Sequence, residues 1–138
     1  MTSLEKFSLR WTDFQENTTT AFRNLRDYLQ FNDVTLVSED GETMEAHKVI
    51  LSASSTFFMN ILKLNKHKHP LVYLKGFKSK ELNSLMNYIY HGVADIYQDD
   101  LDLFLAKAEE LQLNGMAGDE RVRNEKETEV KNYKLTNI

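Results

Sequence analysis

The stretch DVTLVSEDGETMEAHKVILSASSTFF, residues 33–58, decides the fold of this chain. Its first apolar run, 34–37, is rich in β-branched residues and too short for a helix, which predicts a buried strand. Asp40-Gly41 predicts a two-residue hairpin turn, because both residues tolerate positive φ, and 43–46 returns as the second strand. After His47 the apolar residues adopt helical spacing, which predicts two short helices with a cap at Ser54-Ser55-Thr56. These elements together predict an α+β core.

Length and composition set broad limits on function. The chain has 138 residues, 41% hydrophobic and 28% charged, which suits one globular domain with a real core. Its net charge of -4 opposes nucleic-acid binding through bulk electrostatics. The absence of cysteine excludes disulfides, thiol catalysis and cysteine-ligated zinc, and fits a reducing compartment. No apolar run approaches the roughly 20 residues that a membrane span needs, so no membrane association is expected.

The N-terminal segment has two distinct patterns. Phe7, Leu9 and Trp11 alternate with polar residues, which is typical of a half-buried strand. Such a strand either closes its own sheet or pairs with the sheet of a partner chain, and the pattern leaves both alternatives open. Residues 13–29 then predict an amphipathic helix. Its apolar face contains Phe14, Ala21, Phe22, Leu25, Tyr28 and Leu29.

The remaining chain continues the α+β pattern. We expect a strand over 71–74, a helix capped by Ser79 and ended by His91-Gly92, and a strand candidate over 93–97. Asp99 or Asp100 is expected to cap the last helix, which ends at Asn114-Gly115. From residue 119 onwards five acids balance five bases with few apolar residues, which predicts a disordered tail or linker. The domain is therefore expected over 1–118, and the tail over 119–138.

The sequence offers little for catalysis. No serine has a glycine-flanked elbow, and no phosphate loop or metal-binding spacing occurs, so we expect no enzyme, no cofactor and no metal. His67 and His69 could chelate a metal, but with no nearby carboxylate in the sequence a solvated loop is favoured. Asp33 and Lys48 lie at the edges of apolar elements. They are either two exposed end residues or a partly buried charged pair under a groove.

Several blocks of this sequence resemble, in order and spacing, the BTB/POZ domain of the arthropod Tramtrack/Bric-à-brac type. The blocks are FSLRWTDF (7–14), DVTL (33–36), AHKVILSASSTFF (46–58), HPLVYLKGF (69–77), YIYHG (88–92) and QDDLDLFLAKAEELQL (98–113), followed by GMAG (115–118). The resemblance covers roughly residues 7–118.

The resemblance implies a BTB/POZ fold with a helical body and small β-sheets, acting in protein–protein interaction. It implies homodimers through the first helix, and a strand 7–11 exchanged between protomers onto the segment 94–97. The implied oligomer interface consists of Phe7, Leu9, Trp11, Phe14, Ala21, Phe22, Leu25 and Ile96. Asp33 and Lys48 match the charged-pocket positions of the family.

The resemblance also implies the cellular role. Members usually head transcription or chromatin factors, so we expect a nuclear multimerisation module whose partners are itself, other BTB proteins and co-regulators. No DNA-binding motif occurs in this chain, so no direct nucleic-acid contact is expected. The alternative is a substrate adaptor for a cullin-type ubiquitin ligase. It is disfavoured because the segment 64–70 lacks the glutamate that such adaptors often carry.

Overall fold

The structure is a computed structural model that describes residues 4–115. It confirms the α+β class, with five helices and one three-stranded sheet among the described residues. The elements are α1 (Phe14–Asp27), β1 (Val34–Val37), β2 (Thr43–Ala46), α2 (Lys48–Ser54), α3 (Thr56–Leu64), β3 (Leu71–Tyr73), α4 (Ser79–His91) and α5 (Gln98–Glu110). The tail predicted over 119–138 lies outside the described residues.

The mixed sheet has β1 at its centre, with β2 antiparallel on one side and β3 parallel on the other. Val34 and Leu36 are fully buried, whereas the alternate residues of β1 are only half-buried, so one face of the sheet meets the core. The hairpin turn is longer than predicted. The N–H of Ser38 donates to Glu42 O at 2.8 Å, which leaves Glu39, Asp40 and Gly41 as the loop, and Gly41 adopts φ +86°.

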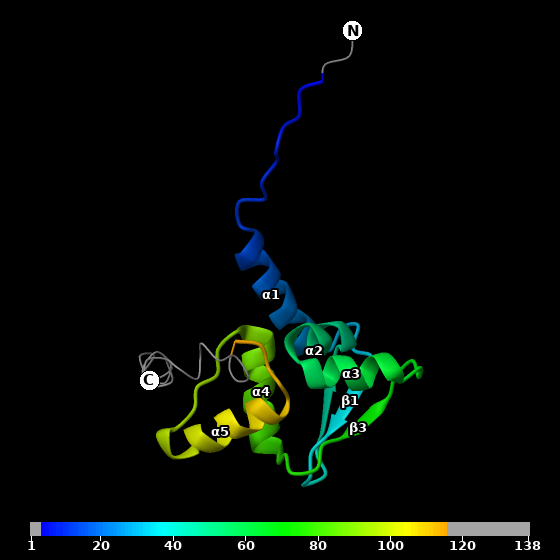
Figure 1. Cartoon of the computed structure of the whole chain (residues 1–138), viewed down its shortest axis with the longest axis vertical. Coiled ribbons are helices and arrows are strands. Elements are labelled where there is room, and N and C mark those ends of the chain that lie inside the picture. Colours follow the sequence, from blue (N-terminus) through cyan, green and yellow to red (C-terminus); the bar gives the residue numbers. More distant parts are fainter. Residues whose placement is uncertain (1–3, 116–138) are drawn as a thin grey trace.

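The helices α2 and α3 form the pair predicted after His47. Ser55 separates them, and its hydroxyl accepts from the N–H of Phe58 at 3.1 Å, which confirms the predicted cap. Figure 1 shows α4 in the middle of the body, with the sheet on one side and α5 on the other. The buried core draws on all of these elements: Val34, Leu36, Ala46, Ile50, Leu51, Phe58, Leu62, Leu74, Phe77, Leu82, Leu85, Met86, Tyr90, Phe104, Ala108, Leu111 and Leu113.

The starts of α4 and α5 differ from prediction. Ser79 is the first residue of α4 and not its cap, because its N–H and hydroxyl both bond the carboxylate of Asp40. At the other end Gly92 stops α4 with φ +77°, as expected for a left-handed C-cap. Helix α5 begins at Gln98, so Asp99 and Asp100 lie in its first turn and not at the cap.

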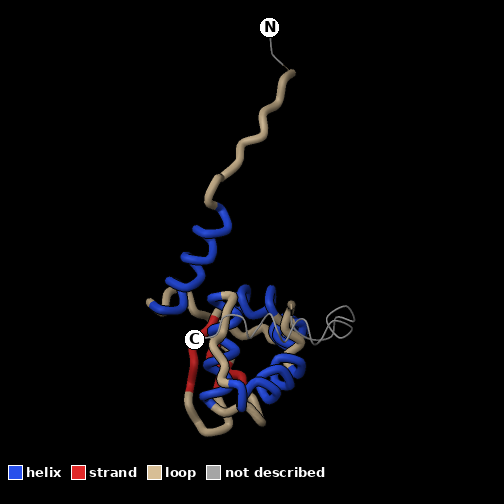
Figure 2. Tube along the Cα trace, turned by 90° about the vertical axis from the view of Figure 1, so that its left-hand side faces the viewer, coloured by secondary structure: helices blue, strands red, loops and turns tan. Residues whose placement is uncertain are grey.

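Two predicted strands are not formed in this single chain. Residues 7–11 extend away from the body beyond α1 in both views (Figures 1 and 2), and residues 93–97 form a loop. A strand needs a ladder partner for its backbone groups, and neither segment has one in a lone protomer. The interpretation that the first strand closes its own sheet is therefore wrong. Exchange between protomers stays a prediction.

Candidate protein-interaction surface

Helix α1 leaves its apolar face uncovered. None of its residues is buried, and Phe14 and Phe22 are exposed although the sequence places both on a single apolar stripe. In Figure 1 the helix projects from the body and contacts it only near its C-terminal end. An amphipathic helix normally gains its stability by burying such a stripe, because isolated helices of this length are marginal in water. Apart from Leu25, which packs against the core, the stripe therefore lacks its counterpart within the described part of the chain.

The segment before α1 extends this apolar surface. Phe7, Leu9 and Trp11 are 81%, 95% and 60% exposed. Trp11 packs edge-on against Phe14 with 5.1 Å between ring centroids, and its carbonyl accepts from the N–H of Phe14 at 3.2 Å. The extended segment and the helix are thereby joined into one continuous surface. Contiguous exposed apolar patches of this kind mark interaction sites.

The base of α1 is fixed to α4 by one arginine. Arg26 Nη1 donates to Asn87 Oδ1 at 2.5 Å and Nη2 donates to Asn83 Oδ1 at 3.0 Å. Its guanidinium also lies over the ring of Tyr90, 5.8 Å from the centroid. Burial lowers the pKa of Arg26 below its ordinary value, although the nearby Asp27 acts in the opposite direction. These contacts set the direction in which α1 leaves the body.

A buried histidine holds the turn that follows α1. His47 Nε2 lies 2.6 Å from Gln30 O, and its Nδ1 lies 2.7 Å from the hydroxyl of Tyr90. On either side of Gln30, Leu29 and Phe31 adopt φ +50° and +60°, which is unfavourable for bulky side chains. The histidine thus stabilises a strained turn that directs two apolar side chains into solvent.

The exposed turn was missed by the sequence analysis. Tyr28 and Leu29 belong to the predicted apolar face of the first helix, and both are exposed, as is Phe31 at 85%. Helical spacing identifies an apolar stripe but not what covers it. The signal that could have indicated this surface was Phe31 in a polar turn, where an apolar ring has no local partner.

The predicted interface residues differ in exposure. Phe7, Leu9, Trp11, Phe14, Ala21 and Phe22 are exposed on the N-terminal segment and α1. Leu25 and Ile96 are half-buried and pack against the core of their own domain. We therefore expect the first six to offer the larger surface to a partner.

Asp33 and Lys48 meet in a different way from the predicted charged pair. Both are half-buried, and Asp33 Oδ1 accepts from the backbone N–H of Lys48 at 2.7 Å. This carboxylate therefore caps the N-terminus of α2, where a negative charge is favoured. The ammonium of Lys48 instead donates to His67 O at 2.7 Å. Within residues 4–115 no salt bridge joins the two side chains.

A carboxylate lies beside His69, although the sequence has none near this residue. His69 Nε2 lies 3.2 Å from Glu45 Oε2 and 2.8 Å from Thr35 Oγ1, because β1 brings its neighbours β2 and β3 together. The sequence alone did not indicate Glu45. Residues 4–115 contain no group of three or more His, Cys, Asp or Glu side chains arranged to hold a metal ion. Across the same residues, no helix combines the length and apolar character needed to cross a bilayer.

The fold and its uncovered apolar surface are those of a protein-interaction domain. A family model described as BTB/POZ domain matches residues 22–119, and the chain belongs to this family. Domains of this family typically self-associate.

Relatives from Drosophila melanogaster extend the match. Longitudinals lacking protein-like is 42% identical over 85% of this chain and 91% of its own length. Broad-complex core protein isoforms 1/2/3/4/5 is 41% identical over 84% of this chain but only 16% of its own length. Sex determination protein fruitless is 40% identical over 81% of this chain and 12% of its own length. The chain thus matches a small part of the latter two proteins.

Solved structures agree on the fold. The BTB domain of zebrafish PATZ1 superposes with a TM-score of 0.69 at 16% identity, covering 92% of this chain and 99% of that one. The BTB domain of human gigaxonin gives a TM-score of 0.67 at 21% identity, covering 79% and 89%. The predicted BTB/POZ fold is confirmed.

Proposed function

We propose that this chain is a self-association module of a nuclear transcription or chromatin factor, forming dimers or larger assemblies with itself and with other BTB proteins. The observation that carries the proposal is the uncovered face of α1, which continues into Phe7, Leu9 and Trp11. A second copy supplies a matching face by two-fold symmetry, since the same patch is then presented twice. The names of the Drosophila relatives Broad-complex core protein and fruitless support a regulatory setting.

The geometry supports a specific arrangement for this proposed contact. Two α1 helices packed side by side would cover Phe14 and Phe22 in both copies, and apolar burial would drive the association. The segment 7–11 has its backbone groups free of a ladder and could pair with residues 94–97 of the partner, which also lack a strand partner. Co-regulators would then bind to the assembled surface, and direct nucleic-acid binding is not proposed for this chain.

Light scattering of the full chain over a dilution series tests this proposal, in about 0.5 M NaCl to screen contacts between surface charges. The wild type is expected to be a dimer or larger. The double variant Phe14→Ser, Phe22→Ser is expected to be a monomer with unchanged circular dichroism. Tyr73→Ser is the matched control, because Tyr73 on β3 is 56% exposed and Phe14 is 54% exposed.

A wild-type monomer at all concentrations would contradict self-association. The cullin-adaptor alternative would then be tested by pull-down with a cullin. The structure gives that alternative no specific support, since the loop between α3 and β3 exposes Lys66 and Lys68 where an adaptor often has a glutamate.

A further inference from the structure

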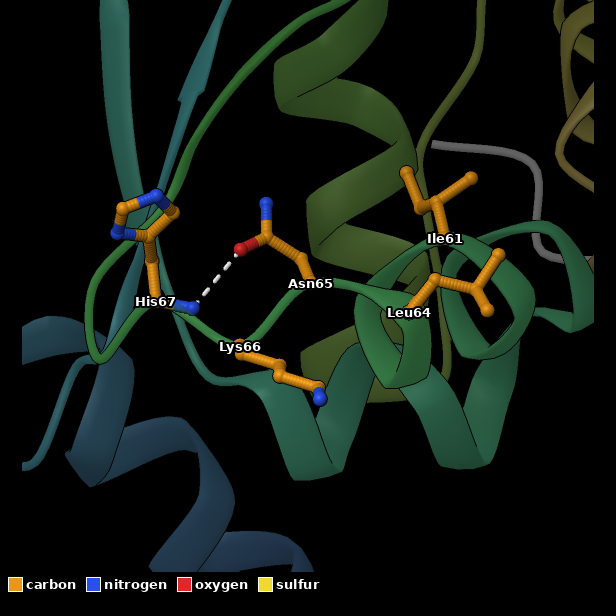
Figure 3. A pocket seen from close by; sticks show the side chains of 5 residues that line it. All are labelled: Ile61, Leu64, Asn65, Lys66 and His67. Carbon is orange, nitrogen blue, oxygen red and sulfur yellow. Dashed lines mark hydrogen bonds between the residues drawn. The ribbon is translucent and has the colours of Figure 1, made fainter.

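A basic surface lies at the end of α3. Ile61 and Leu64 line a shallow depression together with Asn65, Lys66 and His67 (Figure 3). The depression is partly apolar, and Leu64 is 78% exposed. Lys66 lies at its rim, and the neighbouring Lys63 and Lys68 are also exposed, with no acidic residue between positions 61 and 70. We call the five lining residues the basic depression.

Two hydrogen bonds fix the shape of this loop. Asn65 Oδ1 accepts from the N–H of His67 at 2.9 Å, drawn in Figure 3. The ammonium of Lys48, on α2, donates to His67 O at 2.7 Å. The depression is therefore preorganised, which lowers the entropy that a bound partner would have to remove.

An acidic face that includes one exposed apolar residue lies on α5. Asp99, Asp102 and Leu103 have the spacing i, i+3, i+4, so they share one side of the helix, and all three are exposed. Phe104 and Ala108 cover the core-facing side. Leu103 is 46% exposed and lies beside Asp99 on this side of the helix. We call Asp99, Asp102 and Leu103 the acidic α5 face.

The two surfaces are complementary in charge and in apolar content, and they face away from each other. Figure 1 places the start of α5 and the loop between α3 and β3 on opposite sides of the body, so neither can reach the other within one chain. Two copies with net charge -4 repel on average. Electrostatic attraction between two copies arises where a positive surface of one copy meets a negative surface of the other. Contact between these surfaces satisfies that condition.

We propose that the acidic α5 face of one copy docks on the basic depression of a second copy, with Leu103 against Ile61 and Leu64. Lys66 and Lys68 then lie beside Asp99 and Asp102. The contact joins two different surfaces, so it is heterologous and propagates into rings or open chains instead of stopping at a dimer. It is separate from the α1 surface, and together the two contacts would link dimers into larger assemblies.

Charge reversal with complementary mixing tests this docking. One variant carries Lys66→Glu and Lys68→Glu, and the other carries Asp99→Lys and Asp102→Lys, both in the full chain. The measurement is sedimentation velocity at low salt for the wild type, each variant and their equimolar mixture. Wild type is expected to form species above the dimer that disappear in about 0.5 M NaCl, because surface charge contacts are screened there.

Each variant alone is expected to lose at least about tenfold in the affinity that forms these species, because two attractive rim contacts become repulsive. The equimolar mixture is expected to regain them, since each reversed surface then meets its complement. A wild type that never exceeds the dimer, variants that assemble normally, or a mixture that fails to recover would each overturn the proposal. The Phe14→Ser, Phe22→Ser variant separates the two contacts. Assemblies formed by docking of the acidic α5 face on the basic depression should persist at low salt in this variant, although the α1 contact is lost.

Discussion

The hydroxyl of Tyr90 in α4 lies 2.7 Å from Nδ1 of His47, and it also accepts from the backbone N–H of His47 at 2.9 Å. Both residues are buried, at 2% and 6% exposed. The hydroxyl therefore joins α4 to the start of α2, while the far nitrogen of the same imidazole reaches Gln30 O in the turn after α1. Three elements that are distant in sequence are held through one side-chain pair.

Tyr90→Phe removes the hydroxyl and leaves the N–H and Nδ1 of His47 without their partner. We expect a loss of about 1–3 kcal/mol in the free energy of unfolding, because buried polar groups without hydrogen bonds pay their desolvation cost. Denaturant unfolding of both proteins measures the difference. Tyr73→Phe is the control, since that side chain is exposed, and it should unfold like the wild type.

Because of the same tyrosine, we expect the stability of the fold to decrease at alkaline pH. Burial raises the pKa of Tyr90 to about 12 from its ordinary 10.0. The folded state therefore binds the phenolic proton more tightly than the unfolded chain, so the stabilisation is complete below pH 10 and is lost as the pH rises towards 12. Melting temperatures between pH 9 and about 12 should fall more steeply for wild type than for Tyr90→Phe. If the melting temperatures of the two proteins fell in parallel with pH, Tyr90 would not be the group responsible for the alkaline loss of stability.

Because of Asp40, we expect the stability of the fold to decrease at acid pH. Its carboxylate accepts from the hydroxyls of Ser38 and Ser79, and these bonds lower its pKa from 3.8 to about 2. A depressed pKa contributes stability above the unfolded value, which is lost as the pH falls through the folded value. We expect the melting temperature to drop between about pH 4 and pH 2, and less so in Asp40→Asn. An equal drop in that variant would assign the acid sensitivity to other carboxylates.

Ser55 links the start of α3 to the residue that follows α5. Its hydroxyl donates to Leu111 O at 2.5 Å and accepts from the N–H of Phe58, and the residue is fully buried. Ser55→Ala should cost roughly 1–3 kcal/mol, because the cap of α3 and the partner of a buried carbonyl are lost together. Ser52→Ala, half-buried in α2, is the control for the substitution itself. Equal stabilities of the two variants would contradict this role.

The local elements could be predicted from the sequence because their signals are local. Val34 and Leu36 alternate as a strand does, and the apolar residues of α4 recur at helical spacing. Gly92 ends its helix because glycine adopts positive φ at little cost. Matching blocks of residues then indicated the family. None of these inferences required knowledge of which surfaces meet.

The site was less predictable because its contacts join distant segments. His47 and Tyr90 are separated by 43 positions, and no local pattern in the sequence indicated that they meet. For Asp33 and Lys48 the sequence left open two exposed end residues or a partly buried charged pair, whereas the carboxylate of Asp33 accepts from the backbone N–H of Lys48 at the start of α2. Apolar spacing also could not separate Leu25, which packs on its own core, from Phe22, which is exposed.

Asp33 and the ammonium of Lys48 bond different groups, so substitutions of the two residues should have different effects. Its ammonium donates to the carbonyl of His67 at an exposed position, so Lys48→Ala should change the free energy of unfolding by less than about 0.5 kcal/mol. Asp33→Ala should instead cost about 1 kcal/mol, because it removes the cap of α2.

If Lys48 belongs to a functional charged pocket, Lys48→Ala should weaken partner binding more than it weakens folding. The expected reason is that the loop carrying Lys66 and His67 is no longer tied to α2 and loses its preorganised shape. Sedimentation velocity at low salt should therefore show fewer species above the dimer, at an unchanged melting temperature. A Lys48→Ala chain that unfolds, or one that assembles like wild type, would leave Lys48 without a role in binding.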